Sequence, residues 1–307
     1  MPDIVASLDG GGSKTEIAWA DATGRSFRHR LDTGCNPQDR RDWLMPIRAA
    51  LAALPGPPLH ITLGIPGYGE IPALDAEVTA RITELCPQST LMNDVALAYH
   101  GAFPDGGGVL VLAGTGSMAM AQGPQGLHRT GGWGDAFGDE GSAYAIGRAA
   151  LSTASQMIDT RQTDSGFAVE LMARMGCTRD QGPFALMTWA MAQPHPRAAI
   201  AALARHVDAM AAAGQPTARA ILTEAAADLH RHATAAARLA GLAPPLIWST
   251  AGSVFRSQIL TAALTGLIGN LSIPPAHSAL TGGLITAARA TGWSAPPDWR
   301  QILKGPA

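Results

Sequence analysis

The chain has 307 residues, of which 47% are hydrophobic and 15% charged; this composition excludes disordered, collagen-like and coiled-coil proteins and favours two globular domains of ordinary size. The formal net charge is −2 and lysine and arginine do not cluster, so we expect no nucleic-acid partner. The sequence contains neither a signal-like start nor a run of about 18 apolar residues, so we expect a cytoplasmic protein with no membrane partner.

The first third of the sequence alternates β-patterned and helical runs. A glycine-rich turn separates strands predicted at Ile4–Asp9 and Thr15–Ala20, and a third antiparallel strand is predicted at Ser26–Leu31. Asn36 followed by Pro37 is typical of a helix start, and we expect this helix to run to about residue 54. The remaining predictions for this part are strands at 60–65 and 89–92 and helices at 74–85 and 95–101.

A pattern of strand, glycine turn and strand occurs twice in the sequence. Leu8, Gly10, Gly12 and Ser13 recur with the same spacing as Leu112, Gly114, Gly116 and Ser117. From Gly138 onward the sequence favours helices around a smaller sheet. The predicted helices are 141–158, 167–175, 196–213, 217–239, 255–267 and 276–290, with one late strand at 246–250.

The first glycine turn, at residues 9–15, matches neither of the two common nucleotide motifs. A P-loop needs glycine directly before its lysine, where Ser13 stands, and the dinucleotide fingerprint needs its third glycine where Thr15 stands. A hairpin turn with no further role is one interpretation; the other is a turn whose backbone N–H groups and hydroxyls approach a phosphate. Because the pattern occurs twice, two such turns could grip a polyphosphate from both sides, with Asp9 placed to hold a divalent cation.

Four segments resemble motifs of the actin, Hsp70 and sugar kinase superfamily, in the right order along nearly the whole chain. Residues 8–15 resemble the phosphate-1 motif, residues 112–117 the phosphate-2 motif and residues 249–254 the adenosine motif. Residues 131–144 are similar to the signature of N-acetylglucosamine kinases and of the related BadF/BadG-type ATPases. This last segment is the longest and the most specific of the four.

The resemblance implies an α/β fold with duplicated actin-like (ribonuclease H-like) ATPase domains and a cleft between them. The N-terminal domain is expected to comprise residues 1–107 together with about 280–307. The C-terminal domain, with helical insertions, is expected to comprise residues 108–279. A homodimer is expected by the same analogy, and because paired subunits are the commonest oligomer.

ATP and Mg²⁺ are the cofactors that the resemblance implies, with Asp9 as the metal ligand. A structural turn is the alternative role for the adenosine motif, and Lys14 is not required by the phosphate-1 motif and could simply be solvated. The expected nucleotide-binding residues are Asp9, Gly11, Gly12, Ser13 and Thr15 in the first turn, Gly114, Thr115 and Gly116 in the second, and Gly252 and Ser253 in the adenosine motif.

The expected sugar site combines residues from three parts of the sequence. Asp94 lies between a predicted strand and a predicted helix, so its local alternative is a helix N-cap; the resemblance implies that it binds the sugar and, as the catalytic residue, takes the proton from the attacking hydroxyl. Asn36 and Asp139 are expected to hold sugar hydroxyls, although each could instead serve a helix start. Gly132 and Trp133 are expected beside the sugar, because an indole flanked by glycines suits packing on a pyranose ring; a core tryptophan is the alternative.

The resemblance implies transfer of the γ-phosphate of ATP to the 6-hydroxyl of N-acetylglucosamine. Phosphoryl transfer depends mainly on positioning and charge neutralisation, which two phosphate turns, a magnesium aspartate and a base aspartate supply. Glucosamine kinase is an alternative that differs only in the acetylation of the 2-amino group. N-acetylmuramate stays open as an additional acceptor.

Three alternatives lie outside the kinases. A BadF-type ATPase that activates dehydratases would carry an iron–sulfur cluster on cysteines, but Cys35, Cys86 and Cys177 are scattered, without a glycine-flanked pair, and equally suggest neither disulfides nor zinc. A sugar-sensing repressor would need a DNA-binding motif before the first strand at Ile4. An inactive sugar-binding homologue stays open, although all the expected site residues are present.

Overall fold

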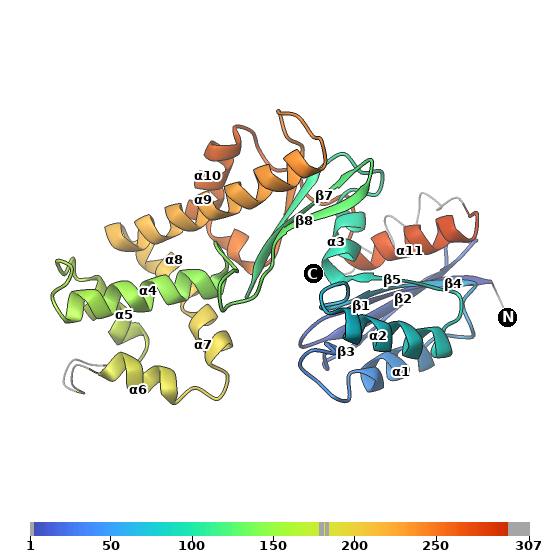
Figure 1. The fold of residues 1–307 in the computed structure, drawn as a ribbon, viewed down its shortest axis with the longest axis horizontal. Helices are drawn as coiled ribbons and strands as arrows, with labels where there is room; N and C mark the ends of the chain where they lie inside the picture. Colours follow the sequence, from blue (N-terminus) through green and yellow to red (C-terminus); the bar gives the residue numbers. More distant parts are fainter. Residues whose placement is uncertain (1–2, 178–180, 182–183, 294–307) are drawn as a thin grey trace. The chain divides into compact units, whose positions relative to one another are not determined.

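The computed structural model describes residues 3–177, 181 and 184–293. The chain forms two compact units, the first made of residues 1–106 and 274–307 and the second of residues 107–273 (Figure 1). Residues 294–307, the end of the predicted N-terminal domain, lie outside the described residues. Within the described ranges, no helix is both long and apolar enough to cross a membrane.

The first unit contains a five-stranded sheet with the strand order β3-β2-β1-β4-β5. Its first three strands form the predicted antiparallel meander, whereas β4 and β5 lie parallel to β1. The carboxyl ends of β1, β4 and β5 therefore meet at one edge, the edge at which open α/β sheets bind ligands. The strands are β1 (Ile4–Gly10), β2 (Thr15–Asp21), β3 (Ser26–Leu31), β4 (His60–Ile65) and β5 (Ser89–Asn93).

Helices cover both faces of this first sheet (Figure 1). Alternate residues of β1 point to opposite faces, so that Leu8 joins the core under α1 and α2 while Val5 packs against α11. α3 lies beside α11. The helices of the first unit are α1 (Leu44–Ala52), α2 (Pro72–Leu85), α3 (Asp94–Ala102) and α11 (Ala279–Ala290).

The helix expected from Pro37 to about residue 54 begins only at Leu44. Asn36 does start a turn, because its carbonyl accepts the N–H groups of Asp39 (3.3 Å) and Arg40 (3.1 Å), but no helix continues from it. A tertiary contact holds this segment instead, since the side-chain amide of Gln38 donates to Glu70 (3.0 Å). The predicted helix start was wrong because long-range packing outweighed the local signal.

The second unit contains a four-stranded sheet with the order β8-β7-β6-β9. Three antiparallel strands and one parallel neighbour match β3-β2-β1-β4, so the predicted repetition of strand, turn and strand is confirmed. The two turns differ in length, because Ser13 lies within its turn whereas Ser117 already begins a strand. The strands are β6 (Val109–Ala113), β7 (Ser117–Gly123), β8 (Gly126–Gly131) and β9 (Trp248–Ala251).

The rest of the second unit is mostly helical, as predicted. The long helix α9 packs along the sheet and against α10, and its buried face consists largely of alanines, which allow close approach. The helix predicted at 196–213 is divided at Leu203, and α6 was not predicted. The helical elements are α4 (Ala143–Ile158), α5 (Phe167–Arg174), α6 (Ala185–Met191), α7 (Pro196–Ala202), α8 (Ala204–Ala212), α9 (Pro216–Leu239), the 3-10 turn η2 (Ser253–Arg256) and α10 (Gln258–Ile268).

Candidate active site

The first glycine turn, between β1 and β2, is closed by a hydrogen bond from the N–H of Gly11 to the carbonyl of Lys14 (2.9 Å). The segment that follows β3 supports it from behind: the N–H of Cys35 donates to the carbonyl of Gly11 (3.0 Å), and Gly34 packs so closely on Gly12 that a Cβ there would overlap it. Gly12 and Ser13 are exposed at the tip. The turn is thus held in one shape with its tip open to a ligand.

Thr15 differs from the expectation for a phosphate ligand. Its side chain is fully buried, and its hydroxyl donates to the carbonyl of Thr33 (2.8 Å), so the group serves the fold. Lys14 is also engaged, because its ammonium pairs with Glu16 (3.1 Å). Ser13 is therefore the residue of this turn that offers an exposed hydroxyl.

Asp9 and Asp94 lie at the carboxyl edge of the same sheet, near the ends of β1 and β5. The strand between them, β4, carries Gly64 opposite Asp9; a Cβ there would come within 3.2 Å of the Cα of Asp94 and 2.8 Å of Leu97. Burial, followed by the charge of Asp94, raises the pKa of Asp9 to about 7. The site therefore holds two carboxylates that resist simultaneous ionisation when no cation is present.

Asp94 is the first residue of α3 and not its N-cap. The cap is Asn93, whose side-chain oxygen accepts the N–H of Val95 (3.0 Å). Burial is the main cause that raises the pKa of Asp94 to about 6; the Val95 N–H opposes this rise, and the charge of Glu70 adds to it. The N-cap alternative was wrong by one residue, although the carboxylate of Asp94 also accepts the N–H of Val95 (3.0 Å).

The loop that carries Asn36 reaches the same edge of the first sheet. The neighbouring Cys35 thiol has its pKa raised to about 11, mainly by burial, and the charges of Asp9 and Asp94 contribute to that rise. Asn36 itself is half-buried; its side-chain oxygen accepts the N–H of Gln38 (3.1 Å), and its amide donates to Asp39 (2.5 Å). The structure thus brings the Asn36 loop, Asp9 and Asp94 together within one unit.

The cysteines are divided between the two units, with Cys35 and Cys86 in the first and Cys177 in the second. Cys35 and Cys177 are buried, and burial raises the pKa of all three thiols. Because iron–sulfur clusters are held by thiolates, these environments disfavour the form that would bind a cluster.

The second glycine turn lies between β6 and β7, where the N–H of Gly114 donates to the carbonyl of Gly116 (2.9 Å). The start of α4 docks on it, because the N–H of Ala143 donates to the carbonyl of Gly114 (2.9 Å) and that of Tyr144 to the carbonyl of Thr115 (3.3 Å). Thr115 is exposed at the tip. Residues of the long signature segment thus support the second turn.

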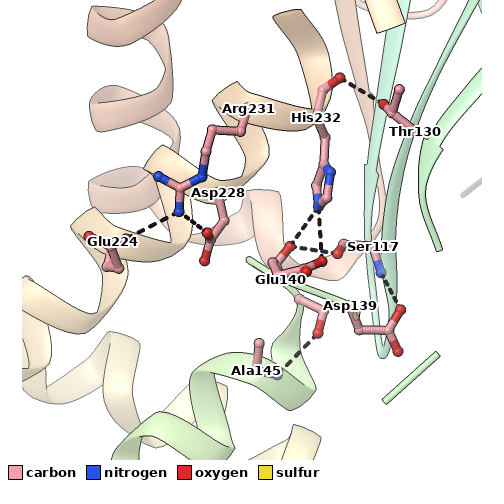
Figure 2. A network of polar contacts seen from close by, with 10 residues as sticks. Ser117, Thr130, Asp139, Glu140, Ala145, Glu224, Asp228, Arg231 and His232 are labelled. Carbon is pink, nitrogen blue, oxygen red and sulfur yellow. Dashed lines mark hydrogen bonds and ion pairs between the residues drawn. The ribbon is translucent and has the colours of Figure 1, made fainter. Parts of the chain in front are cut away.

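Asp139 differs from the expectation for a sugar ligand. It is only 3% exposed, and both carboxylate oxygens have partners: one accepts the N–H of Ser117 (3.2 Å) and the other binds Arg197 (2.6 Å). Figure 2 shows the carboxylate pointing at the backbone nitrogen of Ser117, beside Glu140. Because both oxygens are occupied inside the unit, Asp139 is placed to support the second turn.

The loop between Gly131 and Asp139 presents two aromatic side chains to solvent. Trp133 is 67% exposed, which excludes the core alternative, and Phe137, which the sequence analysis did not single out, is 76% exposed. His232 on α9 joins the two ends of the loop: its ring contacts the carbonyl of Glu140 (3.3 Å), and its own carbonyl accepts the hydroxyl of Thr130 (2.8 Å; Figure 2). The sequence gives no signal for His232, because the contact spans 92 positions.

The second unit also contains a pocket of about 300 Å³ whose lining includes Thr115 of the second turn and Ser253 of the adenosine motif. Gly252, which precedes the lining residue Ser253, has a φ of 108°, and a Cβ there would overlap the carbonyl of Ala113, so only glycine fits. Alanines form much of the lining of this pocket. No sequence pattern marks them as a site, because they come from separate helices. The other lining side chains that the sequence analysis missed include Ile146, Arg205, Asp208, Leu222 and Arg256.

Asp9 is the expected ligand of Mg²⁺. The described residues contain no group of three or more His, Cys, Asp or Glu side chains arranged to hold a metal ion. In nucleotide enzymes, however, Mg²⁺ usually keeps several waters and takes one or two carboxylates together with substrate phosphates. The carboxylate of Asp9, with a raised pKa beside Asp94, fits such a site because a cation would relieve the repulsion between the two charges.

Comparison with known proteins gives several relatives that are named as amino-sugar kinases. A curated relative in Clostridium acetobutylicum, named N-acetylmuramic acid/N-acetylglucosamine kinase, is 39% identical over 72 residues, which are 23% of this chain and 24% of the relative. A solved structure from Chromobacterium violaceum, a structural-genomics target named as an N-acetylglucosamine kinase, has a TM-score of 0.74 at 24% identity and covers 92% of this chain and 98% of its own.

Two further structures share the fold at lower identity. A target from Porphyromonas gingivalis, also named as an N-acetylglucosamine kinase, has a TM-score of 0.67 at 18% identity and covers 94% of this chain and 99% of its own. A ROK family glucokinase from Streptomyces griseus, in complex with glucose and AMPPNP, has a TM-score of 0.53 at 17% identity and covers 94% of this chain and 99% of its own. These likenesses confirm the expected α/β fold. Because the sequence model of the BadF/BadG/BcrA/BcrD ATPase family matches residues 8–273, the chain belongs to that family.

Proposed function

We propose that this protein is an ATP-dependent amino-sugar kinase that transfers the γ-phosphate of ATP to the 6-hydroxyl of N-acetylglucosamine. The observation that carries the proposal is the pair of carboxylates, Asp9 and Asp94, at the edge of the sheet that also bears the first glycine turn. The names of the relatives from Clostridium acetobutylicum, Chromobacterium violaceum and Porphyromonas gingivalis support an amino sugar as the acceptor.

The proposal assigns the nucleotide to three groups of residues. The N–H of Gly12 and the Ser13 hydroxyl would contact phosphate, in a turn that the bond from the N–H of Gly11 to Lys14 holds in shape. The second turn, at residues 114–116, would contact phosphate as well. The pocket lined by Ser253, next to Gly252, would take the adenosine. Asp9 would hold Mg²⁺ directly or through water, and the bound ion would neutralise charge on the transferred phosphate.

Asp94 is proposed as the general base. A catalytic base works best with a pKa near the operating pH, and the pKa of about 6 is much closer to neutral than that of an ordinary aspartate. Asn36, Gly132 and Trp133 are proposed as sugar contacts, the last because its indole is exposed. Asp139 is not included, because its two oxygens already have partners within the unit.

The choice of acceptor can be tested by a coupled assay of ADP release, with magnesium and a panel of glucosamine, N-acetylglucosamine, N-acetylmuramate and glucose. We expect the highest kcat/KM for N-acetylglucosamine. A preference for glucosamine would move the specificity within the kinase class, whereas ADP release that no sugar stimulates would overturn the proposal. A cytoplasmic homodimer belongs to the same proposal, and light scattering of the purified protein tests the dimer.

A further inference from the structure

Asp139 occupies an unusual backbone position next to the second turn. Its φ is 61°, a left-handed conformation that residues other than glycine seldom adopt and that aspartate tolerates better than most. This conformation aims the carboxylate at the turn, where it accepts the N–H of Ser117. A Cβ on Gly116 would lie only 2.7 Å from the same carboxylate oxygen. The turn therefore packs directly on the carboxylate, and the position of one fixes the position of the other.

Arg197 on α7 holds the other oxygen of this carboxylate. Its Nη2 lies 2.6 Å from Asp139, and its Nε lies 3.8 Å from Asp135 in the same loop. The next residue, Ala198, lines the same pocket as Thr115 of the second turn. Arg197 is thus joined to the loop after β8 and, through Asp139, to the second turn.

The energetic reason for the pair follows from burial. Asp139 is almost completely buried, and a buried carboxylate that loses its cation carries an uncompensated charge. Arg197 is 47% exposed, so its own loss of hydration is small. Without Arg197, the carboxylate is expected to turn toward water, and the N–H of Ser117 would lose its acceptor.

We propose that the Asp139–Arg197 pair holds the second turn in its nucleotide-binding conformation, and that Arg197 is a positioning residue for the nucleotide. This inference rests on the proposed function in one respect, the binding of nucleotide at residues 114–116. It differs from a role for Asp139 as a sugar ligand, because it predicts that the effect of breaking the pair appears in nucleotide affinity.

The test measures binding of Mg²⁺–AMPPNP by isothermal calorimetry, without sugar, for wild type, Arg197→Gln, Arg197→Lys and Asp139→Asn. We expect Arg197→Gln to raise the Kd for nucleotide about tenfold, because residues joined in one salt-bridge network are coupled by energies of this size. Arg197→Lys keeps the charge and should bring the Kd back to within about threefold of wild type. Arg174→Gln, which breaks the exposed Arg174–Glu170 pair in the same unit, is the matched control and should leave the Kd unchanged.

Asp139→Asn removes the negative charge that pairs with Arg197 but keeps a side-chain oxygen that can accept the N–H of Ser117. It therefore distinguishes a sugar ligand from a residue that supports the second turn. We expect its effect on nucleotide Kd to be smaller than that of Arg197→Gln, and Arg197→Gln to add little in the Asp139→Asn background. In the kinase assay, Arg197→Gln should raise the KM for ATP while kcat at saturating ATP stays within about twofold. The melting temperature without nucleotide shows whether each variant is folded.

Two results would overturn the inference: an unchanged nucleotide Kd in folded Arg197→Gln, or an Asp139→Asn variant whose KM rises about tenfold for the sugar alone. A wild type that binds nucleotide but phosphorylates no sugar would remove the kinase proposal and leave this inference standing. A wild type that binds no nucleotide would overturn both.

Discussion

The residues that matter most in the first unit are two aspartates kept partly out of water. Asp9 and Asp94 have their pKa values raised to about 7 and about 6, chiefly by burial, so the nucleotide-free fold bears a cost when they ionise. Strained or destabilised groups of this kind concentrate at functional sites. Asn93 is the N-cap of α3 and accepts the same Val95 N–H that Asp94 accepts, so Asp94→Asn should affect chemistry more than folding.

Replacing Asp94 by asparagine tests its role as the base. The amide keeps the size of the side chain but cannot take the proton from the sugar hydroxyl, so we expect kcat to fall by about 100- to 10,000-fold. The Kd for Mg²⁺–AMPPNP should stay within about threefold of wild type. Asp32→Asn, at an exposed carboxylate of the same unit, serves as the control. Turnover above about one tenth of wild type would eliminate Asp94 as the base.

Replacing Asp9 by asparagine should produce a pH-dependent gain in stability without magnesium or nucleotide. The pKa of Asp9 rises from 3.8 to about 7 on folding, so well below pH 3.8 the carboxyl is protonated in both states and does not change the free energy of unfolding. As the pH rises from about 4 to 7 the unfolded chain ionises first, and the wild type loses stability. Asparagine stays uncharged, so Asp9→Asn should gain about 2–4 kcal/mol over this range.

The measurement is the free energy of unfolding of Asp9→Asn and wild type in urea, at several pH values and with a chelator. A difference between Asp9→Asn and wild type that stays constant from pH 4 to 8 would show that Asp9 is not destabilised by burial.

At the scale of elements, α11, the last helix among the described residues, is held within the first unit by close packing. A Cβ on Gly283 would overlap the hydroxyl of Ser7 on β1, whereas a Cβ on Gly266 of α10 would meet nothing within 4 Å. Gly283→Ala should therefore lower the free energy of unfolding by about 1–3 kcal/mol through overpacking. Gly266→Ala should raise it by about 0.5–1 kcal/mol through helix propensity. Equal effects of the two changes in urea unfolding would contradict this packing.

Elements with strong local patterns could be predicted from the sequence, and contacts between distant segments could not. The meander β1-β2-β3 follows from β-patterned runs separated by turn residues, and the late strand β9 from a short β-like run. The helix start at Pro37 failed because Gln38 is held by Glu70, 32 positions away. The hydrogen bonds that engage the side chains of Thr15 and Asp139 could not be predicted either. Their partners, Thr33 and Arg197, are distant in the sequence and come close only in the folded chain.

At the scale of the whole molecule, the recurrence of one strand order in two sheets is the main finding. Three antiparallel strands and a parallel neighbour surround each glycine turn, and this repetition was visible in the spacing of Leu8 and Leu112. Family membership rests on residues 8–273, a range that includes both turns. The identity of the acceptor is not encoded in the topology, because folds of this kind serve different sugars and the choice depends on side chains at the site.

The central claim is that the chain moves a phosphoryl group from ATP to an amino sugar, and identification of the product tests it most directly. Purified protein would be incubated with ATP, Mg²⁺ and N-acetylglucosamine, and the mixture followed by phosphorus NMR with correlation to sugar protons. The account predicts ADP and a sugar phosphate in equal amounts, with the new phosphorus signal coupled to the two protons at carbon 6. Free inorganic phosphate as the product, with the sugar unchanged, would contradict it.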